Sequence, residues 1–185
     1  MIDSDSKAAV EYGVTALWNR SKTADTALEE VYDLHAPSLF RYALALTGRR
    51  DDAEDAVQDL FLRLVRESVR LNRIRDMRSY LFTAVRNSAY SILRRRKSLS
   101  CKERAIIRET DILDESNQTI EVIAMKQEFI QLPIKQRDVI SLKIFEDLTF
   151  AEIAGIIGIS ANTAASRYRY GIEKLRRSLK EDDNG

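Results

Sequence analysis

The side chains best suited to chemistry in this sequence are the arginines and lysines between residues 63 and 104. This stretch carries thirteen basic and three acidic side chains, a net charge of +10, although the whole chain has a formal charge of only +1. An ordinary solvated face explains such a block poorly, so the block indicates a surface that binds a polyanion. Tyr80 and Tyr90 lie within it, and aromatic rings among arginines can stack on unpaired bases. For Tyr90, simple packing inside the protein is the alternative.

The sequence lacks the residue groupings that are typical of an enzyme or a metal site. His35 is the only histidine and Cys101 the only cysteine, and they lie far apart, so they do not form a metal-ligand set. It contains no glycine-rich phosphate loop and no nucleophile grouped with a base. We therefore expect a non-enzymatic protein without catalytic residues, a metal, a cofactor or a small-molecule substrate.

The chain also lacks signals for export or membrane insertion. No apolar run approaches the roughly 20 residues needed to span a bilayer, and the first residues do not combine a basic segment with an apolar one. A lone cysteine cannot form an internal disulfide, which suits a reducing compartment. We expect a cytoplasmic protein that makes no use of a membrane.

The elements that must position the basic side chains are helices. Only two prolines and six glycines interrupt the 185 residues, and few stretches alternate apolar with polar side chains. The pattern predicts an all-α fold of two small helical domains joined by a flexible linker. The expected segments are an N-terminal extension at residues 1–25, a first domain at 26–97, a linker at 98–118 and a second domain at 119–181.

The first domain contains a helix with one acidic side. Apolar residues from Ala53 to Val65 recur at three- and four-residue spacing, which predicts a buried stripe. Asp55, Asp59 and Leu62 fall on the other side of the helix. An apolar side chain among carboxylates on a solvent-facing surface suits docking on a basic partner, whereas the plainer interpretation is a solvated acidic face.

The second domain ends in a pattern that predicts a helix-turn-helix between Leu148 and Leu179. Thr149 is placed to cap one short helix, Gly158 to form a tight turn and Ser160 to cap a longer second helix. In this motif the second helix enters the major groove of DNA, and its early side chains meet base edges. An ordinary helical hairpin with an exposed polar face is the alternative.

Three stretches together resemble the extracytoplasmic function group of bacterial sigma factors. They are AEDAVQDLFLRL (Ala53–Leu64), RSYLFTAVRNSAYSILRRR (Arg78–Arg96) and the segment Leu132–Ser160 with the helix that follows it. Their order and spacing agree with the family from about residue 26 to residue 180. The resemblance implies a subunit that binds core RNA polymerase and directs promoter recognition and DNA strand opening.

The resemblance also implies roles for particular residues. The polymerase contact surface would comprise Asp55, Gln58, Asp59, Phe61 and Leu62. Strand opening and reading of the minus-ten element would use Arg73, Arg75, Arg78, Tyr80, Arg86, Asn87, Arg94 and Arg95. The helix-turn-helix would contact DNA through Asn162, Thr163, Ala165, Ser166, Arg167, Arg169 and Tyr170.

Further partners follow from the same resemblance. Members of this family are commonly held inactive by an anti-sigma factor that covers their polymerase- and DNA-binding faces, so such a partner is implied here beside core RNA polymerase and promoter DNA. The acidic linker resembles the segment that family members thread through the active-site cleft of the polymerase. Its acidic residues are Glu109, Asp111, Asp114 and Glu115. A flexible acidic spacer fits these residues equally well.

Two positions depart from the family's pattern. Ala165 stands where relatives usually have a long basic residue, which bears on the identity of the minus-thirty-five sequence. Ser91 stands where they often have an acid, which bears on minus-ten preference. Neither change disturbs the expected fold.

Two other functions stay open on the sequence alone. A stand-alone dimeric helix-turn-helix regulator would explain Leu148–Leu179, but such a protein has no use for the acidic face or for the basic block at residues 63–104. A helical adaptor with no nucleic-acid role would leave the basic block unexplained.

Overall fold

The computed structural model describes residues 24–66, 74–100 and 120–182, which form seven α-helices. The N-terminal group consists of α2 (Ala24–Thr47), α3 (Arg50–Arg66) and α4 (Met77–Ser100). The C-terminal group consists of α5 (Ile120–Gln131), α6 (Ile134–Ile144), α7 (Phe150–Ile157) and α8 (Ala161–Asp182). The predicted all-α fold is confirmed. Among these helices, none has both the length and the apolar character that crossing a membrane requires.

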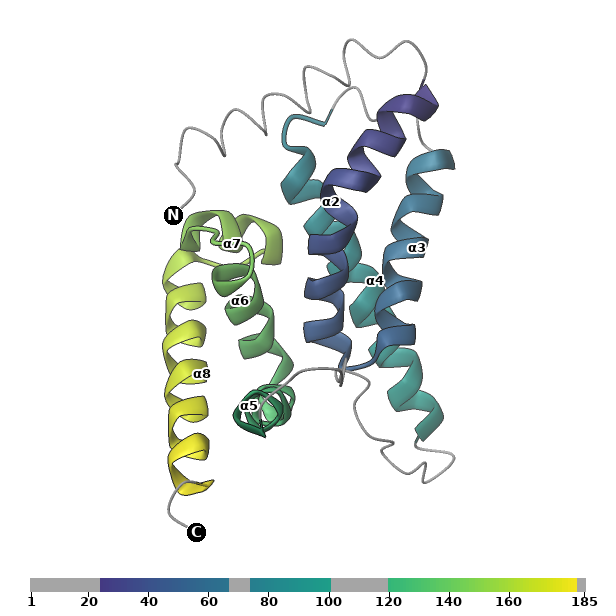
Figure 1. Cartoon of the computed structure of the whole chain (residues 1–185). Coiled ribbons are helices and arrows are strands. Elements are labelled where there is room, and N and C mark those ends of the chain that lie inside the picture. Colours follow the sequence, from purple (N-terminus) through teal and green to yellow (C-terminus); the bar gives the residue numbers. More distant parts are fainter. Residues whose placement is uncertain (1–23, 67–73, 101–119, 183–185) are drawn as a thin grey trace.

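The three helices of the N-terminal group form a bundle in which each contacts the other two (Figure 1). Their apolar residues recur every three or four positions, so each helix has one apolar face, and these faces meet. Tyr42 and Phe82 lie at the centre, both fully buried, with ring centroids 5.4 Å apart. Leu60 and Leu81 pack around them with no exposed surface. Each such side chain stabilises the fold by roughly 1.5–3 kcal/mol.

The ends of these helices differ in two details from the sequence-based expectation. α4 continues to Ser100, three residues into the segment expected to be linker. Val65, expected on the buried stripe of α3, is 56% exposed. It lies in the last turn of that helix, and burial on α3 ends at Leu64.

The C-terminal group is held together where α8 crosses α6 at Gly171. A Cβ atom placed on this buried glycine would lie 2.6 Å from Cδ1 of Ile140 and 3.2 Å from Cβ of Gln136. Both distances are too short for ordinary contact, so the absence of a side chain at Gly171 is what lets the two helices approach this closely. Nothing in the sequence-based analysis singled out this glycine.

We expect Gly171→Ala to lower the free energy of unfolding by about 1–2 kcal/mol. The added methyl group overpacks the helix contact, and the free energy that this costs is larger than the free energy gained from alanine's higher helix propensity. Ile140 is only 2% exposed, so its side chain has little room to move aside. The matched control is Gly155→Ala in α7, where an added Cβ meets nothing within 4 Å. This control should be as stable as the wild type or slightly more stable. Urea unfolding followed by circular dichroism measures both, and an unchanged midpoint for Gly171→Ala would contradict the close crossing.

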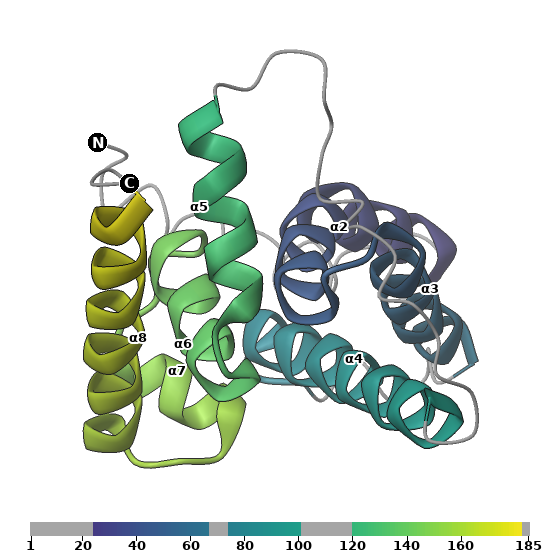
Figure 2. The same ribbon diagram turned by 90° about the horizontal axis from the view of Figure 1, so that it is seen from below.

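The two helical groups pack directly against one another. Contacts run from α2 to α6 and from α4 to α7, and Figure 2 shows α6 and α7 beside the first turns of α4. Val139 and Leu142 of α6 belong to the same buried apolar cluster as Leu81 and Phe82 of α4. The expectation of two domains joined by a linker did not include this interface.

Candidate protein- and nucleic-acid-binding surfaces

The first candidate surface is the outer side of α3. The inner side buries a stripe that includes Ala56, Leu60 and Leu64, which contact α2 and α4. Asp55 and Asp59, four residues apart, therefore face outward together and are exposed. Within the described part of the chain, no salt bridge engages either carboxylate.

Two of the remaining three residues expected on this surface are also exposed. Gln58 is exposed and Leu62 is 54% exposed, so both lie on the outer side of α3 with the carboxylates. Phe61 differs, since it is only 8% exposed and its ring packs edge-on against Tyr32 at 4.7 Å. Phe61 therefore belongs to the buried stripe as well as to the expected contact set. Its ring packs beneath the exposed side chains of this surface and leaves little area for a partner to contact.

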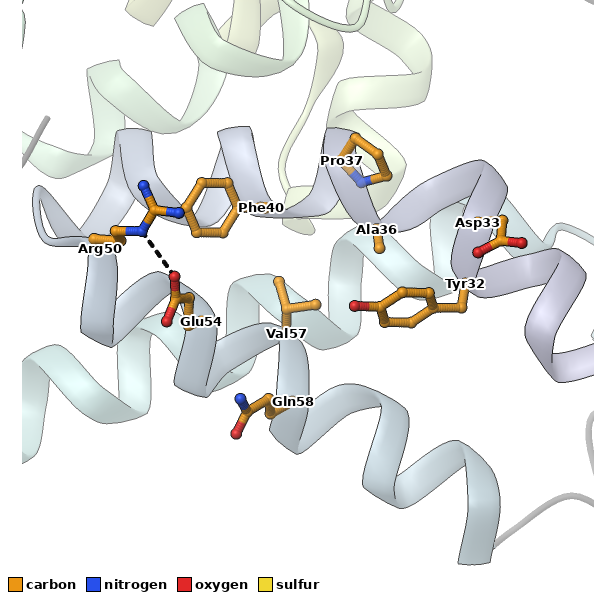
Figure 3. Close-up of a pocket in the computed structure, with 9 residues that line it drawn as sticks. All are labelled: Tyr32, Asp33, Ala36, Pro37, Phe40, Arg50, Glu54, Val57 and Gln58. Carbon is orange, nitrogen blue, oxygen red and sulfur yellow. Dashed lines mark hydrogen bonds and ion pairs between the residues drawn. The ribbon is translucent and has the colours of Figure 1, made fainter. Parts of the chain in front are cut away.

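A pocket opens beside this surface, between α2 and α3. Its volume is about 480 Å³. The residues that line it are Tyr32, Asp33, Ala36, Pro37, Phe40, Arg50, Glu54, Val57 and Gln58 (Figure 3). An ion pair of 2.9 Å between Arg50 and Glu54 lies at one end, near Phe40, and Tyr32 lies at the other. The pocket shares Gln58 with the exposed side of α3, so acidic and apolar surfaces are continuous here.

The second candidate surface is the exposed face of α4. Asn87 and Arg94, seven residues apart, lie on the same side of the helix, and both are exposed. Arg95 and, just before the helix, Arg75 are exposed as well. Tyr80 is half-buried against the apolar core. Arg73, also expected to bind DNA, lies outside the described residues.

The other two arginines expected to bind DNA point toward the C-terminal group. Nη2 of Arg78 donates a hydrogen bond of 2.9 Å to the backbone oxygen of Glu146, and the same nitrogen lies 3.4 Å from Oε2 of that residue. Nε of Arg86 donates a hydrogen bond of 2.8 Å to Oδ2 of Asp138. The side chains of Arg78 and Arg86 are only 16% and 18% exposed. The structure thus divides the expected DNA-binding cluster between two sides of α4.

Asp138 is the centre of a polar network between the groups. This fully buried carboxylate accepts hydrogen bonds from the hydroxyl of Tyr42 at 2.5 Å and from that of Tyr90 at 3.0 Å, in addition to the bond from Arg86. Burial and then the charge of Asp138 raise the pKa of Tyr90 to about 12, and they raise that of Tyr42 well above its usual value. Both tyrosines therefore stay protonated and act as donors. Tyr90 is half-buried against the apolar core, with its hydroxyl bonded to Asp138.

The third candidate surface is the helix-turn-helix of α7 and α8. Oγ1 of Thr149 accepts a hydrogen bond from the backbone nitrogen of Glu152, and the Glu152 carboxylate accepts one from the backbone nitrogen of Thr149, so the predicted cap is a complete capping box. Gly158 ends α7 with a φ angle of 77°, in the left-handed region that glycine favours. Ser160 caps α8 by accepting a hydrogen bond of 3.1 Å from the backbone nitrogen of Thr163. These details confirm the predicted turn.

The outward face of α8 carries most of the side chains expected to meet DNA. Asn162, Thr163, Arg169 and Tyr170 are exposed. Ala165, Ser166 and Arg167 are half-buried. On the opposite side, Ala164 is fully buried and the ring of Tyr168 packs edge-on against Phe150 at 5.7 Å. This packing fixes α8 on α7, so the exposed face is presented on a rigid support.

The sequence matches two families of known proteins. Residues 31–99 match Sigma-70 region 2, and residues 125–175 match Sigma-70, region 4. The ECF RNA polymerase sigma factor SigL of Mycobacterium tuberculosis is 34% identical over 168 residues, which cover 85% of this chain and 92% of SigL. The chain belongs to the extracytoplasmic function sigma factors. It is therefore a non-enzymatic subunit that directs RNA polymerase in promoter recognition.

Three further proteins are similar to this chain in sequence or in fold. SigW of Bacillus subtilis is 22% identical, over 84% of this chain and 90% of SigW. The solved structure of RpoE in complex with the anti-sigma factor NepR from Bartonella quintana superposes with a TM-score of 0.72 at 25% identity, covering 82% of this chain and 96% of RpoE. CnrH, solved in complex with the cytosolic domain of CnrY, has the same fold, with a TM-score of 0.67 at 19% identity, over 93% of this chain and 98% of CnrH.

Membership of this family decides between the functions left open by the sequence. A stand-alone helix-turn-helix regulator or a helical adaptor does not account for a chain that matches both region 2 and region 4.

Within the described ranges, no group of three or more histidine, cysteine, aspartate or glutamate side chains is arranged to hold a metal ion.

Proposed function

We propose that this sigma factor divides its work among three surfaces. The acidic side of α3 binds core RNA polymerase, the exposed face of α4 binds and opens promoter DNA, and the outward face of α8 reads the upstream promoter element. The observation that supports this division is the opposite charge of neighbouring exposed faces, with Asp55 and Asp59 on α3 and Arg94 and Arg95 on α4. The acidic face repels a polyanion such as DNA and the basic face attracts it. One molecule can therefore bind a protein at the first face and DNA at the second.

The polymerase-binding surface extends from α3 across the pocket to α2. Exposed Leu62 supplies an apolar centre among carboxylates, and Tyr32, 51% exposed, supplies a second at the rim of the pocket. Interfaces gain most of their binding energy where an apolar or aromatic side chain enters a pocket and charged groups surround it. We expect a protruding apolar side chain of the polymerase to enter this pocket while the carboxylates meet basic residues.

The exposed face of α4 offers the groups that strand opening needs. Arg94 and Arg95 can hold backbone phosphates, and the amide of Asn87 can donate to and accept from the edge of an unpaired base. On α8, Arg169 can form a bidentate contact to guanine and Asn162 can contact adenine, so the two helices read separate promoter elements.

An anti-sigma factor is a further expected partner. RpoE and CnrH, whose folds this chain shares, were solved with NepR and with the cytosolic domain of CnrY respectively. Because core polymerase and promoter DNA lie in the bacterial cytoplasm, we also infer that the protein acts there.

Transcription in a purified system tests the proposed function. The chain and core polymerase, mixed with a library of promoter sequences, should give run-off transcripts from a defined subset of the library, and neither component alone should do so. Asn87→Ala should relax the selected sequence only at the downstream element, and Arg169→Ala only at the upstream one, each by roughly 1–3 kcal/mol of discrimination at one base pair. Selection of the same sequences by the chain as a dimer without core polymerase would contradict the proposal.

A further inference from the structure

The end of α4 that carries Arg94 and Arg95 extends beyond the apolar core of the N-terminal bundle. Ile92 is the last buried apolar residue described on this helix, and no side chain from Leu93 to Ser98 is buried. Apolar packing therefore contributes little to holding the last turns of α4 in place. Helix ends that lack tertiary contacts fray, because their last backbone carbonyl groups have no partner within the helix.

An ion pair connects this end of α4 to the first turn of α3. Nη1 of Arg96 donates a hydrogen bond of 2.5 Å to Oδ2 of Asp52. The side chain of Asp52 is only 14% exposed, whereas that of its neighbour Asp51 is 72% exposed and pairs with Arg49 just before the helix. A carboxylate covered to this degree loses hydration, and the guanidinium group replaces part of the lost water. The charge of Asp52 is thus used for a contact with α4.

Asp52 and Arg96 stand at core-facing positions of their helices. Asp52 lies four residues before Ala56, and Arg96 lies four residues after Ile92. Ala56 and Ile92 are both buried, and residues four apart share one side of a helix. The ion pair therefore takes the place of the next layer of the core, and it turns Arg96 toward α3. The two arginines before it lie at other angles around α4 and are exposed.

We propose that Asp52 is a positioning residue for strand opening, which holds Arg96 and thereby fixes the end of α4 that presents Arg94 and Arg95 to promoter DNA. This inference rests on the proposed role of α4 in opening DNA. A partly exposed ion pair adds little to the stability of a whole protein, but its directional hydrogen bond holds one helix end in one orientation. Binding groups that are already ordered lose less conformational entropy when they meet their ligand, so the phosphate contacts form more readily.

Removing either partner of the ion pair tests the proposal. With saturating polymerase holoenzyme, Asp52→Ala and Arg96→Ala should each slow promoter opening about fivefold or more, and the double variant should be no slower than either one. Permanganate modification of unpaired thymines, followed over time, measures the rate. Asp51→Ala is the matched control, because it removes a carboxylate from the same turn of α3 that pairs with Arg49 and not with α4. All four variants should keep unfolding midpoints close to that of the wild type.

An apolar replacement of the pair separates positioning from a direct contact between Arg96 and DNA. Asp52→Leu combined with Arg96→Met extends the apolar core to these two positions, and such replacements of an ion pair often keep or raise stability. This variant should open the promoter at a rate within about twofold of the wild type, although neither position carries a charge. Hydrogen exchange of peptides from residues 90–98, read by mass spectrometry, should be faster in both alanine variants and return to the wild-type rate in the apolar pair.

Three results would overturn the inference. The first is slow opening by Arg96→Ala with normal opening by Asp52→Ala, which would make Arg96 a DNA contact. The second is normal opening by both variants, and the third is an apolar pair that restores slow hydrogen exchange without restoring opening.

The variant Arg94→Glu with Arg95→Glu, measured in the same assay, separates this inference from the proposed function. Normal opening by that variant would refute the proposed role of α4, and the inference with it. A defect in that variant beside normal opening by Asp52→Ala would overturn the inference alone.

Discussion

Replacing both Asp55 and Asp59 by arginine is expected to weaken binding to core RNA polymerase at least about 100-fold, which corresponds to about 2.7 kcal/mol. The two carboxylates lie on one exposed side of α3, so reversing them puts four units of charge change at the centre of the proposed interface. Close charge pairs in protein interfaces couple by about 1.5–7 kcal/mol, and like charges placed together cost several more. Because both side chains face solvent, the fold itself should be unaffected.

Fluorescence anisotropy of the labelled chain, titrated with core polymerase, measures this effect. The matched control reverses two other exposed acids, Asp147 and Glu173, to arginine, and it should leave polymerase binding within about threefold of the wild type. A similar loss in both variants would mean that net charge governs binding and that the acidic side of α3 is not the contact surface.

Replacing Arg94 and Arg95 by glutamate is expected to reduce formation of the open promoter complex by about 100-fold or more while binding to core polymerase is retained. A hydrogen bond to a charged group contributes about 1.5–3 kcal/mol, so the loss of two phosphate contacts is enough for a reduction of about 100-fold. Repulsion between the new glutamates and the phosphates adds to this loss. Both residues are exposed near the end of α4.

Permanganate modification of unpaired thymines in the promoter measures strand opening directly. The control variant Lys135→Glu with Lys174→Glu changes the net charge equally at exposed positions outside the predicted DNA-binding set. Strong thymine reactivity with the Arg94→Glu, Arg95→Glu variant, comparable to that of the wild type, would show that the end of α4 takes no part in opening.

The local features of the fold could be predicted from the sequence because their causes are local. The capping box at Thr149, the left-handed turn at Gly158 and the cap at Ser160 each depend on side chains within a few residues, and all three are present. The outward direction of Asp55 and Asp59 follows from the 3.6-residue period of one helix. Phe61 shows the limit of this reasoning, since it was assigned both to the buried stripe and to the contact surface, and its side chain is only 8% exposed.

The features that were missed depend on contacts between distant segments. Asp138 lies in a row of five consecutive buried residues, Asp138–Leu142, so α6 is enclosed on several sides and lacks a plain polar face. A charged residue in such a row could have signalled a buried ion pair, but its partners on α2 and α4 are some 50 to 100 positions away. Gly171 and the pocket beside Tyr32 likewise exist only once separate helices have packed.

A competition experiment tests the division of labour between α3 and α4 most directly. The opening-defective variant, Arg94→Glu with Arg95→Glu, is added in excess to a reaction in which wild-type protein and limiting core polymerase transcribe one promoter. It should inhibit transcription by occupying the polymerase, and the same variant carrying Asp55→Arg and Asp59→Arg in addition should not inhibit. Equal inhibition by both proteins, or none by either, would contradict the assignment of polymerase binding to α3 and strand opening to α4.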